Sequence, residues 1–322
     1  MIYPTKLIKN DLVEIISPSN GVKFEKIKRF ENSIKIIKKF GFSVKEDKYV
    51  RTSLNGVSST SENRVAELNN VLINKNVKAL IACSGGDYII QILDNINYKN
   101  IKKNIKWIQG QSDITDLLFY ITVKYDIATI YSFNANKFGD NNLPKSMIEN
   151  NIKFLKGFNP TQYEYGFRLS NEKIFEPWES ITNFHPIKGR IIGGCMESLK
   201  DIIGTKYDVV KKFINKYKND GIIWYFDIAE MTNEDILRTI WQFKSAGWFK
   251  FCKGVLFGRL NTVITYTNTS LVNAIKYNLV ELDIPILINV DIGHTNPAFT
   301  IVNGSIVKIV KKEKYSLETL FK

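Results

Sequence analysis

The sequence has few of the residues that metal sites and disulfides require. Its 322 residues include two histidines, His185 and His294, and three cysteines, Cys83, Cys195 and Cys252. The cysteines show no C-x-x-C spacing and their number is odd, so neither a disulfide framework nor a zinc knuckle is expected. Because no H-E-x-x-H pattern is present either, we do not expect catalysis by a histidine-bound metal.

Nucleotide-binding loops and long apolar segments are missing as well. The sequence contains neither a G-x-x-x-x-G-K-[ST] loop nor a G-x-G-x-x-G fingerprint, so no cofactor is predicted. No run of 18 apolar residues occurs, and the N-terminal MIYPTKLIKNDLVEIISPSN lacks a long apolar region followed by a small-residue cleavage site. We therefore expect a cytoplasmic protein without a membrane partner.

Positive charge is in excess but is not gathered in one place. The chain has 45 Lys and Arg residues against 32 Asp and Glu, which gives a net charge of +13. Such an excess can attract nucleic acid or an anionic membrane surface. The lysines, however, are scattered among Ile and Asn along the whole chain and no nucleic-acid-binding motif accompanies them. We therefore expect a biased composition and no nucleic-acid partner.

The first half of the chain alternates between strand-like and helix-like segments. Strands are expected within residues 11–18, 77–86, 105–110 and 126–133, and helices within residues 25–42, 61–74 and 113–125. This alternation predicts a parallel sheet with helices on both faces. Ligand sites in such sheets lie at the carboxyl ends of the strands. The Gly85-Gly86 pair and residues 110–113 both fall at such ends and could face one crevice.

The second half is separated from the first by a stretch without a regular pattern. Residues 151–188 are rich in turn formers and aromatic residues, which is typical of an inter-domain connection. A chain of 322 residues is also near the upper limit for a single core. We predict an N-terminal domain over residues 1–150, a linker over residues 151–188, and a smaller mixed C-terminal domain with β-strands over residues 189–322.

The segment Gly110-Gln111-Ser112-Asp113 joins an expected strand to an expected helix and allows two interpretations. Ser and Asp are good helix N-caps, since their side-chain oxygens accept from the first N–H groups of a helix. Alternatively, the Ser112 hydroxyl is exposed over a helix N-terminus, where backbone donors favour developing negative charge. Capping is the commoner use, and these residues alone favour it.

Three further residues at strand ends are candidates for chemistry. His294 follows the apolar run PILIN and is placed like a functional loop residue, the alternative being a hydrogen-bonded turn histidine. Asp227 ends the apolar run GIIWYF, and a carboxylate buried there requires a partner. Glu230 competes with Asp227 for this role, but its odd offset along a strand would place the two side chains on opposite faces.

Several motifs together give the chain a recognisable resemblance. GQSDIT, the upstream glycine pair with its downstream ILDNIN, GRIIGGCMESL, WYFDIAEMTNEDILRTIWQFKSAGWF and DIGHTNPAFTIVNG are similar, in the same order, to the LD-carboxypeptidase family of serine peptidases. That family includes the microcin C immunity proteins. The similarity covers nearly the whole chain, and GQSDIT and GHTNP are its most specific parts. It implies an α/β fold with a Rossmann-like N-terminal domain and a C-terminal domain containing β-strands.

The resemblance also implies roles for five residues. Ser112 corresponds to the family's nucleophile, His294 to its histidine, and Asp227 to its acidic member. The family normally has a glutamate at the position of Asp227, so this chain departs from the pattern by one methylene, about 1.5 Å of reach. The backbone N–H groups of Gly86 and Asp113 correspond to the family's oxyanion donors.

The activity implied by the resemblance is hydrolysis of the amide bond to a terminal D-amino acid of murein-type tetrapeptides. The expected partner is thus a small peptide substrate, in peptidoglycan recycling, and we expect a homodimer. One alternative is a hydrolase of peptidyl-nucleotide antibiotics, and another is a binding protein that has lost turnover. A free substrate carboxylate calls for an arginine, for which Arg190, Arg238 and Arg259 are candidates that the spacing does not separate.

Overall fold

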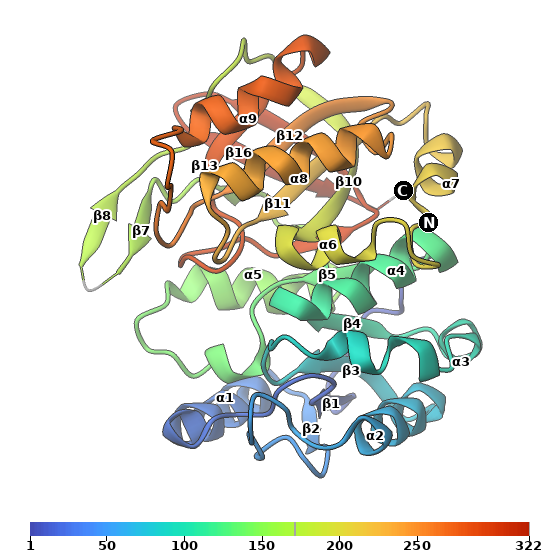
Figure 1. The fold of residues 1–322 in the computed structure, drawn as a ribbon. Coiled ribbons are helices and arrows are strands. Elements are labelled where there is room, and N and C mark those ends of the chain that lie inside the picture. The colour runs from blue at the N-terminus through green and yellow to red at the C-terminus, as the bar shows by residue number, and fades with distance from the viewer. Residues whose placement is uncertain (171, 322) are drawn as a thin grey trace. The chain divides into compact units, whose positions relative to one another are not determined.

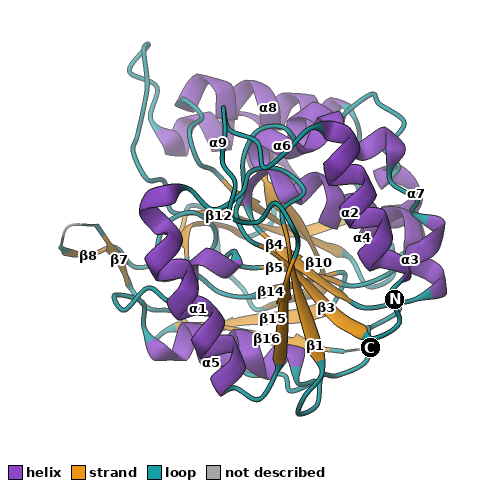
Figure 2. Cartoon of the chain, turned by 90° about the horizontal axis from the view of Figure 1, so that it is seen from below, coloured by secondary structure: helices purple, strands orange, loops and turns teal. Residues whose placement is uncertain are grey.

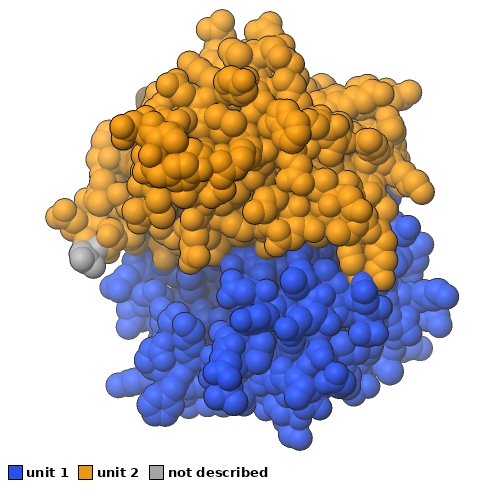
Figure 3. All heavy atoms as spheres, viewed as in Figure 1, with its two compact units in different colours: residues 1–158, 300–303 blue, residues 159–299, 304–322 orange. Residues whose placement is uncertain are grey.

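The computed structural model describes residues 1–170 and 172–321 and divides the chain into two compact units, coloured separately in Figure 3. Unit 1 comprises residues 1–158 and 300–303, and unit 2 comprises residues 159–299 and 304–322. Each unit is built around its own large sheet. The mixed α/β class with a parallel-rich, Rossmann-like first sheet is confirmed.

The sheet of unit 1 has six strands. They are β1 (Leu12–Ile16), β2 (Ser43–Glu46), β3 (Val77–Ala82), β4 (Trp107–Gly110), β5 (Thr129–Tyr131) and β14 (Ile301–Asn303). Their order across the sheet is β14-β5-β4-β3-β1-β2, and all pairs are parallel except β14 with β5. The sequence pattern therefore predicted the parallel pairing, whereas β14 joins from a distant part of the chain.

Helices cover both faces of this sheet. They are α1 (Ile27–Lys39), α2 (Ser61–Ile73), α3 (Lys99–Lys103), α4 (Thr115–Tyr125) and α5 (Lys145–Leu155). Figure 2 shows α1 and α5 on one face and α2, α3 and α4 on the other. Short 3-10 turns occur at Phe24–Lys26, Ile89–Gln91, Leu93–Asn95, Ser112–Ile114 and Ala135–Lys137.

The helix α1 illustrates why these segments form helices. Phe30 and Ile37 are spaced by two turns and are both fully buried, while the lysines of the same segment are mostly exposed. Lys38 and Lys39 lie in the last turn, where positive charge interacts favourably with the helix dipole. Burial of the apolar stripe, at about 1.5–3 kcal/mol for each large side chain, fixes this helix on the sheet.

The strand order determines where a site can form in unit 1. The order reverses direction between β1 and β3, which is the switch point of a doubly wound sheet. Residues 17–20 follow β1, residues 84–86 follow β3, and residues 111–113 follow β4. Because these strands are parallel, all three turns emerge at the same edge of the sheet.

The sheet of unit 2 has eight strands in the order β6-β16-β15-β10-β11-β12-β13-β9. They are β6 (Gln162–Tyr163), β9 (Glu179–Ser180), β10 (Ile187–Cys195), β11 (Ile222–Asp227), β12 (Cys252–Gly258), β13 (Ile286–Val290), β15 (Ile306–Lys311) and β16 (Tyr315–Leu320). The central four, β10 to β13, are parallel, and the flanking pairs are antiparallel. In the β10–β11 register Cys195 lies opposite Asp227, so both stand at the carboxyl edge.

Helices and a hairpin complete unit 2. The helices are α6 (Met196–Ile202), α7 (Val210–Lys216), α8 (Asn233–Ser245) and α9 (Leu271–Leu279), with a 3-10 turn at Val280–Leu282. Figure 1 shows α8 and α9 side by side over the sheet. The hairpin consists of β7 (Phe167–Leu169) and β8 (Lys173–Phe175), and it lies with β6 and β9 inside the stretch 151–188.

The chain in its described part contains no helix that is both long and apolar enough to span a membrane.

Candidate active site

Ser112 stands in an unusual backbone conformation at the turn after β4. Its φ is 68°, in the left-handed region that costs a non-glycine residue about 1–3 kcal/mol. The surrounding turn holds it there, since the Gln111 N–H donates to Asn134 Oδ1 at 3.1 Å and the Ser112 N–H donates to the Tyr131 hydroxyl at 3.4 Å. A strained serine between a strand and a helix is the geometry of a nucleophile elbow.

The interpretation of this segment as a helix cap, which the residues alone favour, is wrong. Neither the 3-10 turn Ser112–Ile114 nor the helix α4 has a side-chain hydrogen bond at its N-cap. The Asp113 carboxylate instead accepts from the Ser19 hydroxyl and, at 3.4 Å, from the Ile89 N–H. Asp113 therefore joins the turn after β4 to the turns after β1 and β3, and the capping role that we expected for it is not present.

The glycine pair packs directly on Ser112. A Cβ atom added to Gly85 would lie 2.7 Å from Ser112 Cβ and 3.1 Å from Ser112 Oγ, so only glycine fits there. Among the hydrogen bonds that residues 1–170 and 172–321 form between backbone groups outside helices and strands, none is donated by the Gly86 N–H or the Asp113 N–H. Both N–H groups belong to turns that follow the neighbouring parallel strands β3 and β4.

The Asp113 side chain is unusual in its electrostatics. Burial raises its pKa to about 6, although the hydrogen bond from Ser19 opposes the shift. Its Oδ1 atom is buried and has no hydrogen-bond partner in the described part of the chain. The loop around Ser112 therefore contains a carboxyl group with a pKa near 6 that accepts few hydrogen bonds.

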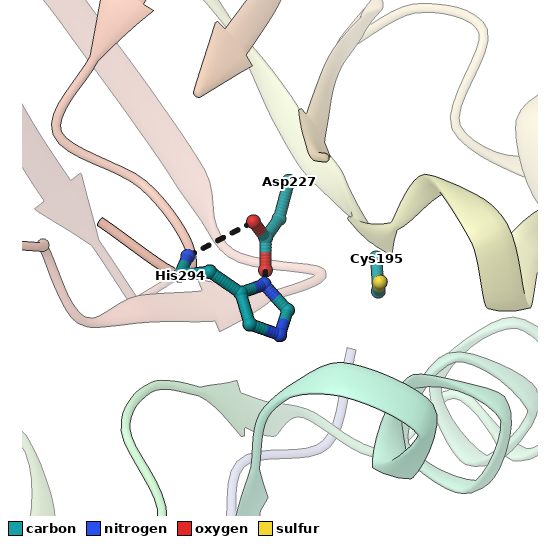
Figure 4. A group of neighbouring side chains, drawn as sticks. All are labelled: Cys195, Asp227 and His294. Atoms are coloured by element: carbon teal, nitrogen blue, oxygen red, sulfur yellow. Dashed lines mark hydrogen bonds and ion pairs between the residues drawn. The ribbon is translucent and has the colours of Figure 1, made fainter. Parts of the chain in front are cut away.

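In unit 2, Asp227 and His294 form a close pair, shown in Figure 4. Asp227 Oδ2 lies 2.8 Å from His294 Nδ1, and Asp227 Oδ1 accepts from the His294 backbone N–H at 3.0 Å. The carboxylate is fully buried, whereas the imidazole is 22 % exposed. A proton held on Nδ1 by this carboxylate leaves Nε2 as the basic nitrogen of the ring.

Gly293 allows this approach. Its φ is +99°, and a Cβ atom in its place would overlap Asp227 Oδ1. Both the backbone conformation and the lack of space therefore require glycine immediately before His294.

Glu230, the competing acid, lies elsewhere. Its side chain is exposed, and its backbone N–H and that of Ala229 each donate to Glu197 Oε1 at 2.9 Å. Asp227 is therefore the acid that contacts His294, and Glu197 fixes the turn that follows Asp227. The sequence analysis missed Glu197 because its partners are backbone groups more than thirty residues away.

Asp291 anchors the start of the loop that carries His294. This carboxylate is fully buried and pairs with Arg259. It also accepts from the Tyr165 N–H at 2.9 Å and from Trp178 Nε1 at 2.7 Å. Asp291 was missed as well, although a carboxylate that directly follows an apolar strand is the same signal that identified Asp227.

Comparison with known proteins identifies the family of this chain. The model of the LD-carboxypeptidase N-terminal domain matches residues 13–132, and the model of the LD-carboxypeptidase C-terminal domain matches residues 188–309. The chain belongs to the LD-carboxypeptidase family. It is thus a hydrolase of the serine peptidase class.

Individual relatives resemble this chain along almost its full length. The "Probable murein peptide carboxypeptidase" of Bacillus subtilis is 22% identical, with 97% of this chain and 92% of the relative covered. The microcin C7 self-immunity protein MccF of Escherichia coli is 23% identical, with 92% and 90% covered. A solved MccF-like protein from Bacillus anthracis superposes with a TM-score of 0.84 at 23% identity, covering 100% of both chains.

Cys195 lies beside the Asp227–His294 pair and completes a candidate set of metal ligands. One ligand atom from each of Cys195, Asp227 and His294 falls within 4.8 Å of the others (Figure 4). The thiol, however, donates to Glu197 Oε2 at 3.1 Å, and burial raises its pKa well above the usual range, with the nearby carboxylates adding to the effect. A metal requires the thiolate, so this environment is a poor fit for one.

The arginine candidates differ in how far they are engaged. All three side-chain nitrogen positions of Arg190 donate to Asp220 or to the Gly304 carbonyl. Those of Arg259 donate to the Glu176 carbonyl or to Asp291. Both therefore hold unit 2 together.

The remaining arginine and the second histidine are exposed. Arg238 on α8 is 59% exposed and pairs with Asp235. His185 is exposed between β9 and β10, outside the Asp227–His294 pair. Neither residue is part of the candidate site of unit 2.

Proposed function

We propose that Ser112, His294 and Asp227 act as the nucleophile, general base and orienting acid of a serine carboxypeptidase. The observation that carries this proposal is the Asp227–His294 pair, in which both oxygens of a fully buried carboxylate are directed at one histidine. Such a pair fixes the imidazole with Nε2 as the base, which is the arrangement that activates a serine hydroxyl.

In the first half of the proposed reaction, Ser112 Oγ forms a bond to the scissile carbonyl carbon and passes its proton to His294 Nε2. The carbonyl oxygen becomes an oxyanion that accepts from the N–H groups of Gly86 and Asp113. Each such donor is worth about 3 kcal/mol in comparable sites. When the C–N bond breaks, His294 returns the proton to the leaving amine, and an acyl-serine remains.

In the second half, water attacks the acyl-serine while His294 Nε2 takes its proton. The second tetrahedral intermediate uses the same two backbone donors. Its collapse releases the shortened peptide as a carboxylic acid, and His294 returns the proton to Ser112 Oγ. Asp227 stays ionised throughout and stabilises the imidazolium that forms twice in each cycle.

The aspartate at the family's glutamate position bears on whether the protein is catalytically active. Asp227 Oδ1 accepts from the His294 backbone N–H at 3.0 Å and Asp227 Oδ2 lies 2.8 Å from His294 Nδ1, so the shorter side chain still reaches the histidine. This supports an active enzyme over a binding protein that has lost turnover.

For the substrate, we propose the amide bond to the terminal D-amino acid of a murein-type tetrapeptide. The second candidate, a peptidyl-nucleotide antibiotic, is favoured by the similarity to the microcin C7 self-immunity protein. Incubation with a murein tetrapeptide and, separately, with an aminoacyl-sulfamoyl nucleoside conjugate, followed by mass spectrometry, separates the two. Loss of the D-amino acid mass alone supports the first candidate, and cleavage of the conjugate alone supports the second.

The same experiment can reject both candidates. If wild type cleaves neither substrate and also fails to react with an active-serine phosphonate, the binding-protein alternative gains. Ser112→Ala is the matched control, since it removes only the proposed nucleophile.

We further propose that the enzyme is a homodimer that acts in the cytoplasm in peptidoglycan recycling. Trp241 on α8 and Tyr277 on α9 support self-association, since they are 58% and 75% exposed. The thiols of Cys83, Cys195 and Cys252 form no disulfide in the described part of the chain, which fits a reducing compartment. Light scattering at several concentrations tests the dimer, and a strictly monomeric mass would contradict it.

A further inference from the structure

Ser19 occupies a central position among the three turns at the carboxyl edge of the unit 1 sheet. It lies in the turn after β1 and is fully buried. Its hydroxyl donates to Asp113 Oδ2 and accepts from the Tyr88 N–H at 3.4 Å. One hydroxyl thereby contacts both the turn after β3 and the turn after β4.

The neighbouring backbone strengthens the link to the glycine pair. The Asn20 N–H donates to the Gly85 carbonyl at 3.2 Å. A Cβ atom added to Gly86 would overlap Ser19 Oγ, so the Gly86 backbone packs directly on the serine hydroxyl. The position of Gly86 is therefore set by Ser19 from one side.

Asp113 depends on the same hydroxyl. Ser19 provides the side-chain donor to this carboxylate, which also accepts the Ile89 N–H at 3.4 Å and whose Oδ1 has no hydrogen-bond partner in the described residues. Loss of a donor to a buried charged group costs about 1–3 kcal/mol and allows the group to move. Movement of Asp113 would displace its own backbone N–H.

We propose that Ser19 is a positioning residue for the oxyanion donors. Through its contacts with the turns after β3 and β4, it fixes the positions of the Gly86 and Asp113 N–H groups relative to each other. This inference rests on the proposed function. Ser19 touches neither the substrate nor the reacting atoms, and it acts through the two backbone donors. Its removal should therefore impair stabilisation of the oxyanion more than binding of the substrate.

The test uses the full-length chain and its reaction with a fluorophosphonate, which forms a tetrahedral adduct on an activated serine and does not depend on the natural substrate. Ser19→Ala should lower the maximal labelling rate by about 10- to 100-fold, less than the loss of a whole oxyanion donor, and leave the half-saturating probe concentration within about threefold. Ser19→Cys, with a weaker donor of similar shape, should lie between wild type and alanine.

Ser58→Ala is the matched control. Ser58 is also a buried serine of unit 1, and its hydroxyl donates to the Ser17 carbonyl at 2.7 Å, but it has no hydrogen bond to Asp113. We expect Ser58→Ala to label within about threefold of wild type even if its melting temperature falls as far as that of Ser19→Ala. Equal rate losses in the two variants at equal loss of stability would show a merely structural role and overturn the proposal.

Coupling to Asp113 gives a second readout. If Ser19 acts through this carboxyl group, Ser19→Ala should cost less in an Asp113→Asn background than in wild type, whereas strictly additive losses would contradict the proposal. If Ser19→Ala does not fold, Ser19→Cys decides, and a wild-type labelling rate overturns the inference. Ser112→Ala distinguishes failure of the Ser19 proposal from failure of the proposed function. If the Ser19 variants are labelled at Ser112 at the wild-type rate, only the role of Ser19 is wrong. If Ser112→Ala is still labelled, both the role of Ser19 and the nucleophile assignment are wrong.

Discussion

The two units present their candidate residues by different physical means. In unit 1, Ser112 and the two proposed oxyanion donors are placed by the backbone, through a left-handed serine, a glycine pair and turns joined by Ser19 and Asp113. In unit 2, His294 is placed by a side chain, since the Asp227 carboxylate holds both its ring and its backbone N–H.

This difference determines which substitutions should be damaging. A backbone arrangement is lost when space or φ is changed, and it survives many changes of side chain that respect both. A side-chain arrangement is lost when one charged group is removed from a buried pair, because its partner is then left uncompensated. Substitutions in unit 1 and in unit 2 therefore test the two arrangements separately.

The largest effect should come from Ser112→Ala. Removal of the hydroxyl should lower kcat by roughly 10⁴-fold or more, because loss of a triad nucleophile leaves only the contribution of binding and the oxyanion donors. The melting temperature should change little, since Ser112 does not cap the helix that follows. A variant that retains more than about a hundredth of the wild-type kcat would contradict the nucleophile assignment.

In unit 2, Asp227→Asn should lower kcat by roughly 10³- to 10⁴-fold, because the amide favours the wrong imidazole tautomer and removes the charge that stabilises imidazolium. Glu230→Gln is the control and should leave kcat within about threefold, since its side chain is exposed. A large loss of kcat in Glu230→Gln alone would show that Glu230, three residues further on, is the acid.

Asp227→Glu restores the family's usual residue and sharpens the same point. Asp227 already contacts His294 through both carboxylate oxygens and its side chain is fully buried, so an added methylene must displace His294 or the loop at Gly293. We expect about a 10-fold loss of kcat, the consequence of overpacking by about 1–3 kcal/mol. Increased turnover would show instead that the natural chain is a weakened enzyme.

Gly293→Ala tests whether unit 2 also depends on its backbone. The new Cβ would overlap Asp227 Oδ1 and would require a φ of +99° from alanine. We expect a loss of about 1–3 kcal/mol in the free energy of unfolding and roughly a 10- to 100-fold loss of kcat. Urea denaturation and steady-state kinetics measure the two effects. Wild-type values for both would mean that the loop can move away from Asp227 at no cost.

Asp113→Asn should change the pH dependence of stability in unit 1. Burial raises the pKa of Asp113 from 3.8 to about 6, so its stabilising contribution is complete below about pH 4 and is lost as the pH rises through 6. The asparagine variant cannot lose it and should gain about 1–3 kcal/mol relative to wild type between pH 4 and pH 7. Urea titrations at both pH values measure this difference, and parallel curves would contradict the shift.

The smallest effect should come from chelation. Dialysis against a strong chelator should leave kcat unchanged, because the Cys195 thiol is protonated and bonded to Glu197 while Asp227 and His294 face each other. A reversible loss that zinc restores would show that the Cys195, Asp227 and His294 cluster binds a metal in the active enzyme.

The sequence by itself determined the α/β class, the parallel pairing of unit 1 and the candidate residues. Apolar runs that alternate with helical periodicity allow few other folds, and motifs at strand ends identify positions near a sheet edge. It could not decide between cap and nucleophile for Ser112, because both uses require the same residue types at a strand-to-helix turn.

Only the tertiary structure decided the contacts. The left-handed φ of Ser112, the choice of Asp227 over Glu230, and the roles of Ser19, Glu197 and Asp291 all depend on partners that lie far away in the sequence. A hydrogen bond acts over about 3 Å, and no periodicity along the chain records which distant group will stand at that distance. The sequence therefore determines which residues are available for chemistry, and the packing of the turns determines which of them contact each other.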